Sequence, residues 1–294
     1  NHGKLFFKKG DLRDKKFLED FFLELKNKNI NITSVIHFAG LKSVEESVSQ
    51  PLKYYEYNVN STLNLLEIMD KFNCNNLVFS SSATIYKSNK HSKLNEKSLK
   101  EPLNPYGNTK LTIEKILEDL FISNPNKWKI ANLRYFNPVG AHDSGLIGEN
   151  PQNEPTNLFP ILLDVAKKKK KELYIFGNDW PTKDGTCVRD YIHIMDLADA
   201  HLKALEFLKN NNPQIIAFNI GTGIGTSVKE IIEKFKLVNN VSIPYKFKER
   251  RKGDHASVIA DNSLSLNLLK WKPQRNINDI CKDLWKYSNT ILAN

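Results

Sequence analysis

The sequence predicts an α/β fold built around a doubly wound parallel sheet, and three observations carry that prediction. Short apolar runs alternate with segments whose apolar residues recur at helical spacing, as expected of βαβ units. Small or polar residues follow these runs directly, as in Ala39-Gly40 and in Ser80-Ser81-Ser82. The 294 residues are 40% hydrophobic and 26% charged, a globular composition in a chain long enough for two domains.

The first half of the chain contains four apolar runs that we expect to be strands, at residues 5–7, 34–38, 76–79 and 130–136. Helical spacing predicts helices over residues 17–25, 52–72 and 106–120. Leu63, Leu66 and Met69 should form the buried stripe of the second helix. Ligands of parallel sheets bind beyond the carboxyl ends of the strands. We therefore expect functional groups at Asp11 and at residues 39–40, 80–82 and 136–137.

The composition changes at the start of the second half, where residues 138–190 are rich in Pro, Gly and Asn. This region should contain a helix near 158–170 and a strand near 173–176. Helices over 196–208 and 228–236 and strands over 217–220 and 242–247 then precede a tail that contains Trp271. The sequence thus predicts a sheet domain of residues 1–138 and 184–224. A smaller mixed α/β lobe of residues 139–183 and 225–294 is interleaved with it.

The net charge of +10 comes from 43 Lys and Arg residues against 33 Asp and Glu residues. The densest basic run, at residues 167–171, is expected to be the solvated end of a helix. No basic strand is interleaved with aromatic residues, so no nucleic-acid partner is predicted. No apolar run approaches the roughly 18 residues of a membrane span, so no membrane partner is predicted.

Cysteine usage argues against structural metal and disulfides. Cys74, Cys187 and Cys281 are odd in number, lie far apart and form no C-x-x-C motif. This pattern disfavours a disulfide framework and a cysteine zinc site, so no metal is expected. It favours a reducing compartment, which we take to be the cytoplasm.

Tyr106 and Lys110 are the candidate catalytic pair. They are four residues apart at the start of a predicted helix and so share one face. A lysine ammonium close to a phenol should lower the pKa of the phenol and make the tyrosine a usable general base. Ser82, at the end of the preceding strand, could hold the substrate hydroxyl that Tyr106 deprotonates. A second such spacing, Tyr86 with Lys90, has no helical stripe and is interpreted as chance.

Several long strings accompany this pair: residues 35–42 (VIHFAGLK), 80–86 (SSSATIY), 105–110 (PYGNTK), 134–142 (RYFNPVGAH), 176–179 (FGND), 184–199 (DGTCVRDYIHIMDLAD) and 250–254 (RRKGD). From about residue 5 to residue 273 the chain resembles the UDP-glucose 4-epimerase family of the extended short-chain dehydrogenase/reductase superfamily. The resemblance implies a Rossmann-like NAD-binding domain and a nucleotide-sugar-binding lobe. It also implies interconversion of UDP-galactose and UDP-glucose through a transient 4-keto sugar, and a homodimer.

The resemblance assigns roles to particular residues. Tyr106 would take the proton of the sugar 4-hydroxyl, Ser82 would orient that hydroxyl with Thr84 beside it, and Lys110 would hold the nicotinamide ribose. The expected cofactor-binding residues are Asp11, Leu12, Phe38, Ala39, Gly40, Lys42, Asn58, Ser80, Tyr106, Lys110 and Phe136. For Gly40 a close approach of the backbone to the ligand is a physical reason as well.

The resemblance also implies a set of residues that bind the nucleotide sugar. They are Ser82, Thr84, Tyr106, Asn137, Asn157, Leu158, Tyr174, Phe176, Arg189, Arg251, Asp254 and Val258. The two arginines would neutralise the diphosphate, a task that suits guanidinium groups. Val258 occupies the position where a bulky Tyr restricts family members to unmodified hexoses. A small residue there predicts tolerance for UDP-N-acetylglucosamine and UDP-N-acetylgalactosamine.

The family's Gly-rich turn, G-x-x-G-x-x-G, is the main departure. Only Gly3 and Gly10 precede Gly40, and the resemblance starts at the family's third strand, so the first βαβ unit is missing from this sequence. We expect the segment around Phe6 to lack a neighbouring strand and the strand around Ile36 to leave an apolar sheet edge exposed. The chain is therefore expected to be a fragment that folds poorly and binds NAD weakly.

Two alternatives stay open at this point. One is a nucleotide-sugar 4,6-dehydratase or decarboxylase of the same superfamily, although Ser82-Ala83-Thr84 offers no acidic residue for an elimination. The other is an inactive NAD-binding homologue, which the missing Gly-rich turn favours and the intact Ser82, Tyr106 and Lys110 disfavour.

Overall fold

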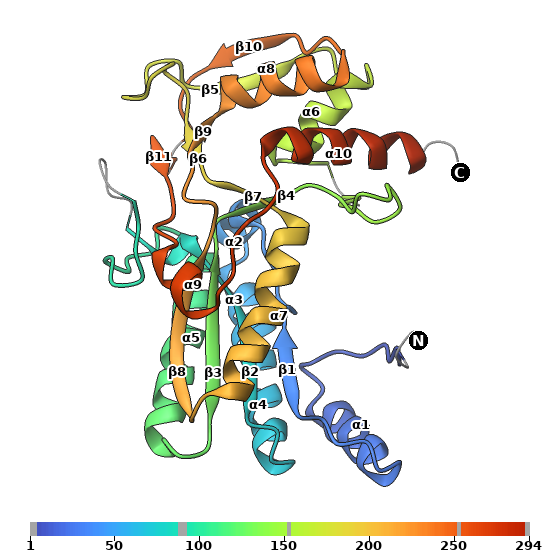
Figure 1. Cartoon of the computed structure of the whole chain (residues 1–294), viewed down its shortest axis with the longest axis vertical. Coiled ribbons are helices and arrows are strands. Elements are labelled where there is room, and N and C mark those ends of the chain that lie inside the picture. Colours follow the sequence, from blue (N-terminus) through green and yellow to red (C-terminus); the bar gives the residue numbers. More distant parts are fainter. Residues whose placement is uncertain (1–4, 88–92, 152–153, 252–253, 292–294) are drawn as a thin grey trace. The chain divides into compact units, whose positions relative to one another are not determined.

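The computed structural model describes residues 5–87, 93–151, 154–251 and 254–291 (Figure 1). The chain forms two compact units, and each is made of segments that are far apart in the sequence. Unit 1 comprises Asn1–Ile85, Lys100–Asn132 and Leu205–Ile216. Unit 2 comprises Tyr86–Leu99, Leu133–Ala204 and Ala217–Asn294.

Unit 1 is a parallel sheet with helices. Its elements are α1 (Lys15–Asn27), β1 (Ser34–His37), α2 (Val44–Ser49), α3 (Pro51–Tyr54), the π-helical turn η1 (Tyr55–Asn60), α4 (Ser61–Lys71), β2 (Asn76–Ser82), the 3-10 turn η2 (Ala83–Ile85) and α5 (Pro105–Ser123). Strands β3 (Lys129–Tyr135) and β8 (Gln214–Ile220) begin in this unit and complete a four-stranded sheet of order β1-β2-β3-β8. β1 and β2 are parallel, with Ser34 opposite Asn76 and His37 opposite Phe79.

One apolar cluster holds unit 1 together. It takes its buried residues from α1, α4, β2, α5 and β3, and they include Leu18, Phe22, Leu65, Leu66, Met69, Leu77, Phe79, Ile113, Leu117 and Ile130. The helices therefore bury one apolar stripe each, as their sequence period predicts. This packing fixes α5 beside the carboxyl end of β2, where the candidate catalytic residues lie.

The structure confirms the strands predicted at 34–38, 76–79 and 130–136 and the helices predicted at 17–25, 52–72 and 106–120, with shifted bounds. The strand predicted at residues 5–7 is wrong. These residues form no strand, and Leu5 and Phe7 are almost fully exposed. A strand exists only through hydrogen bonds to a neighbour, and no described strand pairs with this segment.

The predicted stripe of the long helix also needs correction. Leu66 and Met69 are buried, but Leu63 is 39% exposed, whereas Leu65 and Ile68 are buried. Residues three apart drift by about 60° around an α-helix at each step. The buried face is centred nearer Leu65 and Met69, and Leu63 falls outside it.

Unit 2 contains short sheets and helices. Its elements are β4 (Asn137–Val139), α6 (Leu158–Ala166), β5 (Leu173–Phe176), β6 (Val188–Arg189), β7 (Tyr191–His193), the start of α7 (Ile194–Asn210), β9 (Thr226–Ser227), α8 (Val228–Asn239), β10 (Tyr245–Lys248), β11 (Ser257–Val258), α9 (Ser263–Leu268) and α10 (Ile277–Ile291). The strand orders are β10-β5, β11-β6-β9 and β4-β7. The helices predicted at 196–208 and 228–236 are confirmed. The sequence pattern gave no element for the tail that forms α9 and α10.

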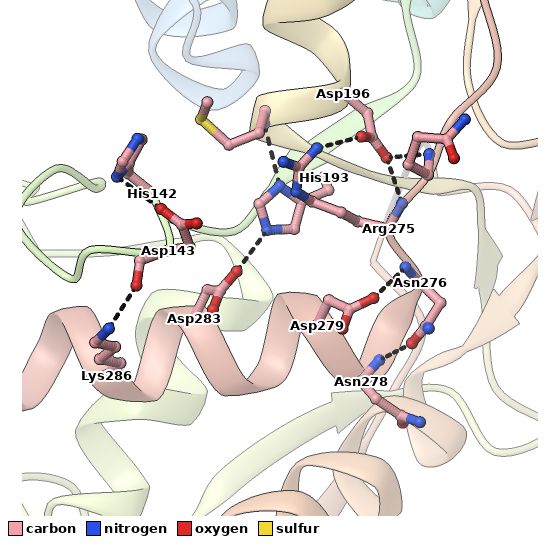
Figure 2. Close-up of polar contacts among 12 residues, drawn as sticks. His142, Asp143, His193, Asp196, Arg275, Asn276, Asn278, Asp279, Asp283 and Lys286 are labelled. Carbon is pink, nitrogen blue, oxygen red and sulfur yellow. Dashed lines mark hydrogen bonds and ion pairs between the residues drawn. The ribbon is translucent and has the colours of Figure 1, made fainter.

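Polar contacts fix α10 within unit 2 (Figure 2). The backbone N–H of Met195 donates to His193 Nδ1, so His193 carries its hydrogen on Nε2 and donates it to Asp283 of α10 at 3.2 Å. Lys286 of the same helix donates to the carbonyl of Asp143 at 2.6 Å. A buried imidazole–carboxylate pair and a surface lysine thus complement the apolar face of α10.

None of the helices in the described part of the chain is both long enough and apolar enough to cross a membrane.

Candidate active site

The first turn of α5 brings Tyr106 to the end of β2. The side chain of Asn104 caps the helix by accepting from the backbone N–H of Gly107 at 2.9 Å. A Cβ on Gly107 would lie 2.8 Å from the carbonyl oxygen of Thr84, so the helix approaches the η2 turn more closely than a larger residue would allow. The glycine thereby places its neighbour Tyr106 against the residues that follow β2.

Ser82, Thr84 and Tyr106 are brought together, as predicted. The Oγ of Ser82 accepts from the backbone N–H of Thr84 at 3.2 Å and lies 3.0 Å from the Thr84 hydroxyl, which donates to it. The Ser82 hydroxyl also lies near enough to the Tyr106 phenol to lower the pKa of that group. The Ser82 hydroxyl is therefore held by Thr84 beside the phenol.

Lys110 is a buried cation at the carboxyl end of β2. Its Nζ donates to the carbonyl oxygen of Ser80 at 2.7 Å and lies 3.4 Å from the Ser80 hydroxyl. It also lies 4.8 Å from the centre of the Phe79 ring, close enough for a cation–π attraction. Burial nevertheless lowers the pKa of Lys110 to about 8.

The prediction that Lys110 lowers the pKa of Tyr106 is wrong in direction for the protein alone. Burial raises the pKa of Tyr106, and only the hydrogen bond from Ser82 opposes it. The Lys110 Nζ is 5.9 Å from the centre of the tyrosine ring and is directed at Ser80 instead. Removal of water from the phenolate therefore outweighs the effect of the Ser82 hydroxyl on the pKa of Tyr106.

Asn58 clamps the chain just beyond β1. Its Oδ1 accepts from the backbone N–H of Leu41 at 2.7 Å, and its Nδ2 donates to the Leu41 carbonyl at 3.1 Å and to Thr109 Oγ1 at 3.0 Å. A Cβ on Gly40 would meet Asn58 Oδ1 at 3.0 Å. The contact with Asn58 therefore favours glycine at position 40, in addition to the expected approach of a ligand.

The other expected cofactor residues of unit 1 also follow strand ends or turns. Phe38, Ala39, Gly40 and Lys42 follow β1 and are exposed. Near α1, Arg13 forms an ion pair with Asp11 at 2.7 Å and lowers the pKa of that carboxyl group. Arg13 also lies over the Tyr57 ring at 3.6 Å. Leu12 packs partly buried against the core of unit 1, so its side chain is shared between core and surface.

The expected nucleotide-sugar residues of unit 2 fall into two contacting groups. Arg189 of β6 forms an ion pair with Asp254 at 3.6 Å and pairs in register with Val258 of β11. Separately, the Arg251 guanidinium lies 3.8 Å over the ring of Phe176. Both arginines keep a rigid guanidinium plane beside a partner, which is the geometry that suits recognition of a diphosphate.

Four further expected residues of unit 2 are placed by other elements. Asn157 precedes α6 and Leu158 is its first residue. Tyr174 of β5 is half-exposed, with the Lys248 ammonium 3.7 Å over its ring, and Asn137 pairs with Tyr191 between β4 and β7. Phe136 is buried, and its N–H donates to the carbonyl of Ile220.

Lys252 and Gly253 of the 250–254 string lie outside the described residues, as does Lys90. Tyr86, the partner of Lys90 in the second spacing, is buried and donates to Asn219.

Sequence reasoning missed Thr109 and Glu114 of α5. Thr109 Oγ1 donates to the carbonyl of Tyr106 at 2.7 Å and accepts from Asn58. Glu114 is buried and accepts from Ser81 at 2.6 Å. A signal existed for Glu114, because a charged residue falls between Ile113 and Leu117 of the apolar stripe.

Comparisons with known proteins show which family this chain resembles. The family profile described as GDP-mannose 4,6 dehydratase matches residues 1–284. A UDP-glucose 4-epimerase of Bacillus subtilis is 46% identical over 286 residues, which are 97% of this chain and 82% of that protein.

Two solved structures have the same fold. The UDP-glucose 4-epimerase of Stenotrophomonas maltophila, with bound NAD and formylated UDP-arabinopyranose, matches with a TM-score of 0.93 and 43% identity over 98% of this chain and 83% of that one. The enzyme of Bifidobacterium longum, in complex with NAD+ and UDP, matches with a TM-score of 0.89 and 43% identity over 96% and 82%. With this likeness, and with Tyr106 placed beside the buried Ser82 and Lys110, the chain belongs to the UDP-glucose 4-epimerase family of the extended short-chain dehydrogenases/reductases.

Proposed function

We propose that the chain is an NAD-dependent UDP-hexose 4-epimerase that interconverts UDP-glucose and UDP-galactose. The observation that carries the proposal is the clustering of the partly buried Tyr106 with the buried Ser82 and Lys110 in a chain 46% identical to a named epimerase. The dehydratase alternative is disfavoured, since the turn after β2 supplies hydroxyls from Ser82 and Thr84 and no carboxylate.

The residues at the carboxyl ends of β1 and β2 fit an NAD molecule. An ammonium carries three hydrogens, and Ser80 accepts at two positions near Lys110, so one hydrogen is left for a ribose hydroxyl. The exposed residues Phe38 to Gly40 would lie along the dinucleotide, and Asp11 with Leu12 would contact its adenine. When bound, NAD accepts the hydride of the sugar C4 and returns it.

The chain's own residues would orient the sugar and move its proton. Ser82 would hold the 4-hydroxyl, with Thr84 fixing the Ser82 hydroxyl, and Tyr106 Oη would take the proton and later return it. Because burial raises the pKa of Tyr106, proton transfer requires the Ser82 hydrogen bond and nearby positive charge to stabilise the phenolate.

Unit 2 would hold the nucleotide part of the substrate. Arg189 and Arg251 would neutralise the diphosphate, Tyr174 and Phe176 of β5 would lie beside the uracil, and Asp254 would contact the uridine ribose. Asn137, Asn157 and Leu158 would complete the site. The division into a cofactor domain of residues 1–138 and 184–224 and a nucleotide-sugar lobe stays a prediction.

Val258 supports a wider substrate range. Its side chain is small and its strand β11 pairs with β6 at Arg189, the proposed diphosphate ligand. We therefore propose turnover of UDP-N-acetylglucosamine as well as of UDP-glucose. Replacement of Val258 by Tyr should abolish turnover of the N-acetyl sugar and spare that of UDP-glucose, and equal loss of both would refute the assignment.

The test of the main proposal is a UDP-galactose conversion assay with NAD present. Tyr106→Phe should lose turnover by about 100-fold to 10,000-fold, the range for a general acid–base group. Tyr55→Phe is the matched control, since Tyr55 lies in η1 with a partly exposed ring and has no proposed role. Unchanged turnover in Y106F, or release of a dehydrated 4-keto product by the wild type, would contradict the proposal.

We also propose that the protein is a cytoplasmic homodimer. Free buried cysteines at positions 74, 187 and 281 support a reducing compartment. Exposed apolar side chains on α2, α3 and α4, namely Val48, Leu52 and Leu63, support self-association through the helices of unit 1.

A further inference from the structure

Three consecutive serines at the end of β2 each face a different residue of α5. All three serines are buried, and their partners are spaced four residues apart along one face of the helix. Two of the pairs are hydrogen-bonded, Ser80 with Lys110 at 2.7 Å and Ser81 with Glu114 at 2.6 Å, and in the other pair Ser82 lowers the pKa of Tyr106. The pairs of Lys110 and Tyr106 contain the proposed catalytic groups, and the pair of Glu114 contains neither.

Glu114 carries a carboxyl group into the interior of unit 1. Its side chain is 5% exposed, and Ser81, which donates to it, is 1% exposed. Burying a carboxylate is costly unless it accepts hydrogen bonds, and a bond shielded from water is stronger than an exposed one. Glu114, one helical turn beyond Lys110, therefore makes a directional hydrogen bond with β2. An apolar side chain at this position would leave α5 free to shift along β2.

We infer that Glu114 and Ser81 are positioning residues that fix the register of α5 against β2. The close approach of Gly107 to Thr84 fixes the first turn of the helix, and the Glu114–Ser81 bond fixes a second point almost two turns further along. A slip of one residue moves a helix by about 1.5 Å and rotates it by about 100°. Two fixed points prevent that motion and hold the Tyr106 and Lys110 side chains at Ser82 and Ser80.

The kinetic test rests on the proposed epimerase activity. Glu114→Ala and Ser81→Ala should each lower kcat about tenfold or more and leave KM within about twofold, because misplacement by about 1 Å impairs chemistry more than binding. Glu114→Gln should retain most activity, since its amide oxygen still accepts from Ser81. Glu118→Ala, one turn further on the exposed face of α5, is the matched control and should behave as wild type.

A second readout is independent of activity. In protein labelled with a carbon isotope at the tyrosine Cζ, the NMR signal that disappears in Y106F reports the titration of Tyr106. In S81A and E114A this titration should move to higher pH, because the hydrogen bond from Ser82 that lowers the pKa is weakened. E114Q and E118A should titrate as wild type. The acid limb of the kcat profile should move in the same direction.

The outcomes separate the two proposals. A shifted titration in S81A together with an inactive wild type would sustain the positioning role and sink the epimerase assignment. Wild-type kcat and wild-type titration in both S81A and E114A would overturn the positioning role. Should E114A fail to fold, S81A and E114Q still decide, because the first removes the bond and the second keeps it.

Discussion

At the residue scale, burial of the Lys110 ammonium lowers the stability of the folded protein and places a cation in the candidate active site. Its ammonium is buried beside Ser80, and burial lowers its pKa from 10.5 to about 8. Between these values the unfolded chain binds more protons than the folded chain, so the free energy of unfolding rises with pH across this window. Below pH 8 the cost of burying the charge is present in full.

The substitution Lys110→Met removes the charge and approximately keeps the volume of the side chain. This variant should lose activity, and the stability of wild type relative to K110M should increase by about 2 kcal/mol between pH 8 and pH 10. Urea unfolding of both proteins at the two pH values measures the difference. A wild-type stability that falls relative to K110M over this range would contradict the burial of a charged Lys110.

His37 makes a prediction of the same sign in acid, where its own titration falls. Its Nε2 lies 2.9 Å from Thr62 Oγ1, and the Thr62 hydroxyl donates to the carbonyl of Asn58, so His37 must donate. Burial, together with the charge of Lys110, lowers the pKa of His37 from 6.5 to about 3. The imidazole is therefore neutral in the folded protein at every pH above that value.

The unfolded chain binds a proton at His37 below pH 6.5, so the free energy of unfolding falls as the pH drops from 6.5 toward 3. Between pH 6.5 and pH 5 the loss should reach about 2 kcal/mol. His37→Gln keeps a donor for Thr62 and lacks the titration, so its unfolding free energy should fall by that much less. Equal acid sensitivity of H37Q and wild type in urea titrations would show that His37 is not the group responsible.

At the scale of elements, the close contact of α5 with η2 is the sensitive point. A Cβ at position 107 would lie 2.8 Å from the Thr84 carbonyl oxygen and 2.8 Å from Pro102 Cβ. Backbone cannot yield as the end of a side chain can, so Gly107→Ala should push the first turn of α5 away from Ser82. We expect a kcat at least about tenfold lower and a loss of about 1–3 kcal/mol of stability.

Asn108→Ala is the matched control, because Asn108 lies on the same turn of α5 and is half-buried, and the substitution removes atoms where Gly107→Ala adds one. Steady-state kinetics and thermal unfolding of both variants check the expectation. An active and stable G107A would mean that α5 can move away from η2 without disturbing Tyr106.

Elements with a clear period could be predicted from the sequence, and elements whose form depends on tertiary contacts could not. The runs that became β1, β2 and β3 are apolar and end in small or polar residues, so their positions were predictable. The π-helical turn was not, because six residues are too few for its different period to show in the sequence. The segment at residues 5–7 has the composition of a strand, but pairing decides whether a strand forms.

The site residues also fall into those that the sequence predicts and those that depend on tertiary contacts. Ser82, Tyr106 and Lys110 were predictable because spacing on a helix places Tyr106 and Lys110 on one face after a strand end. The clamp that Asn58 forms on Leu41 joins residues 17 apart in the sequence, and the Ser81–Glu114 bond joins residues 33 apart. No periodic signal marks such pairs, so only the folded chain reveals them.

At the scale of the whole molecule, self-association is the testable property. Leu52 is 83% exposed at the start of α3, and desolvating such a side chain between two copies would be worth about 1.5–3 kcal/mol. Leu52→Lys should therefore shift a dimer toward monomer by tenfold or more in its dissociation constant, as measured by sedimentation. Leu237→Lys is the matched control, since Leu237 of α8 is equally exposed in unit 2. Equal association of both variants would place the interface elsewhere.

The π-helical turn from Tyr55 to Asn60 has a consequence for how this protein tolerates mutation. The side chains of Tyr55, Glu56 and Asn60 are exposed, so substitutions there change little. Loss of any one residue before Asn58 would turn that side chain by about 100° relative to the preceding helix and release Leu41. In this segment the number of residues is therefore under tighter constraint than their identity, and a library of single deletions beside single alanines should show folding lost in the first and kept in the second.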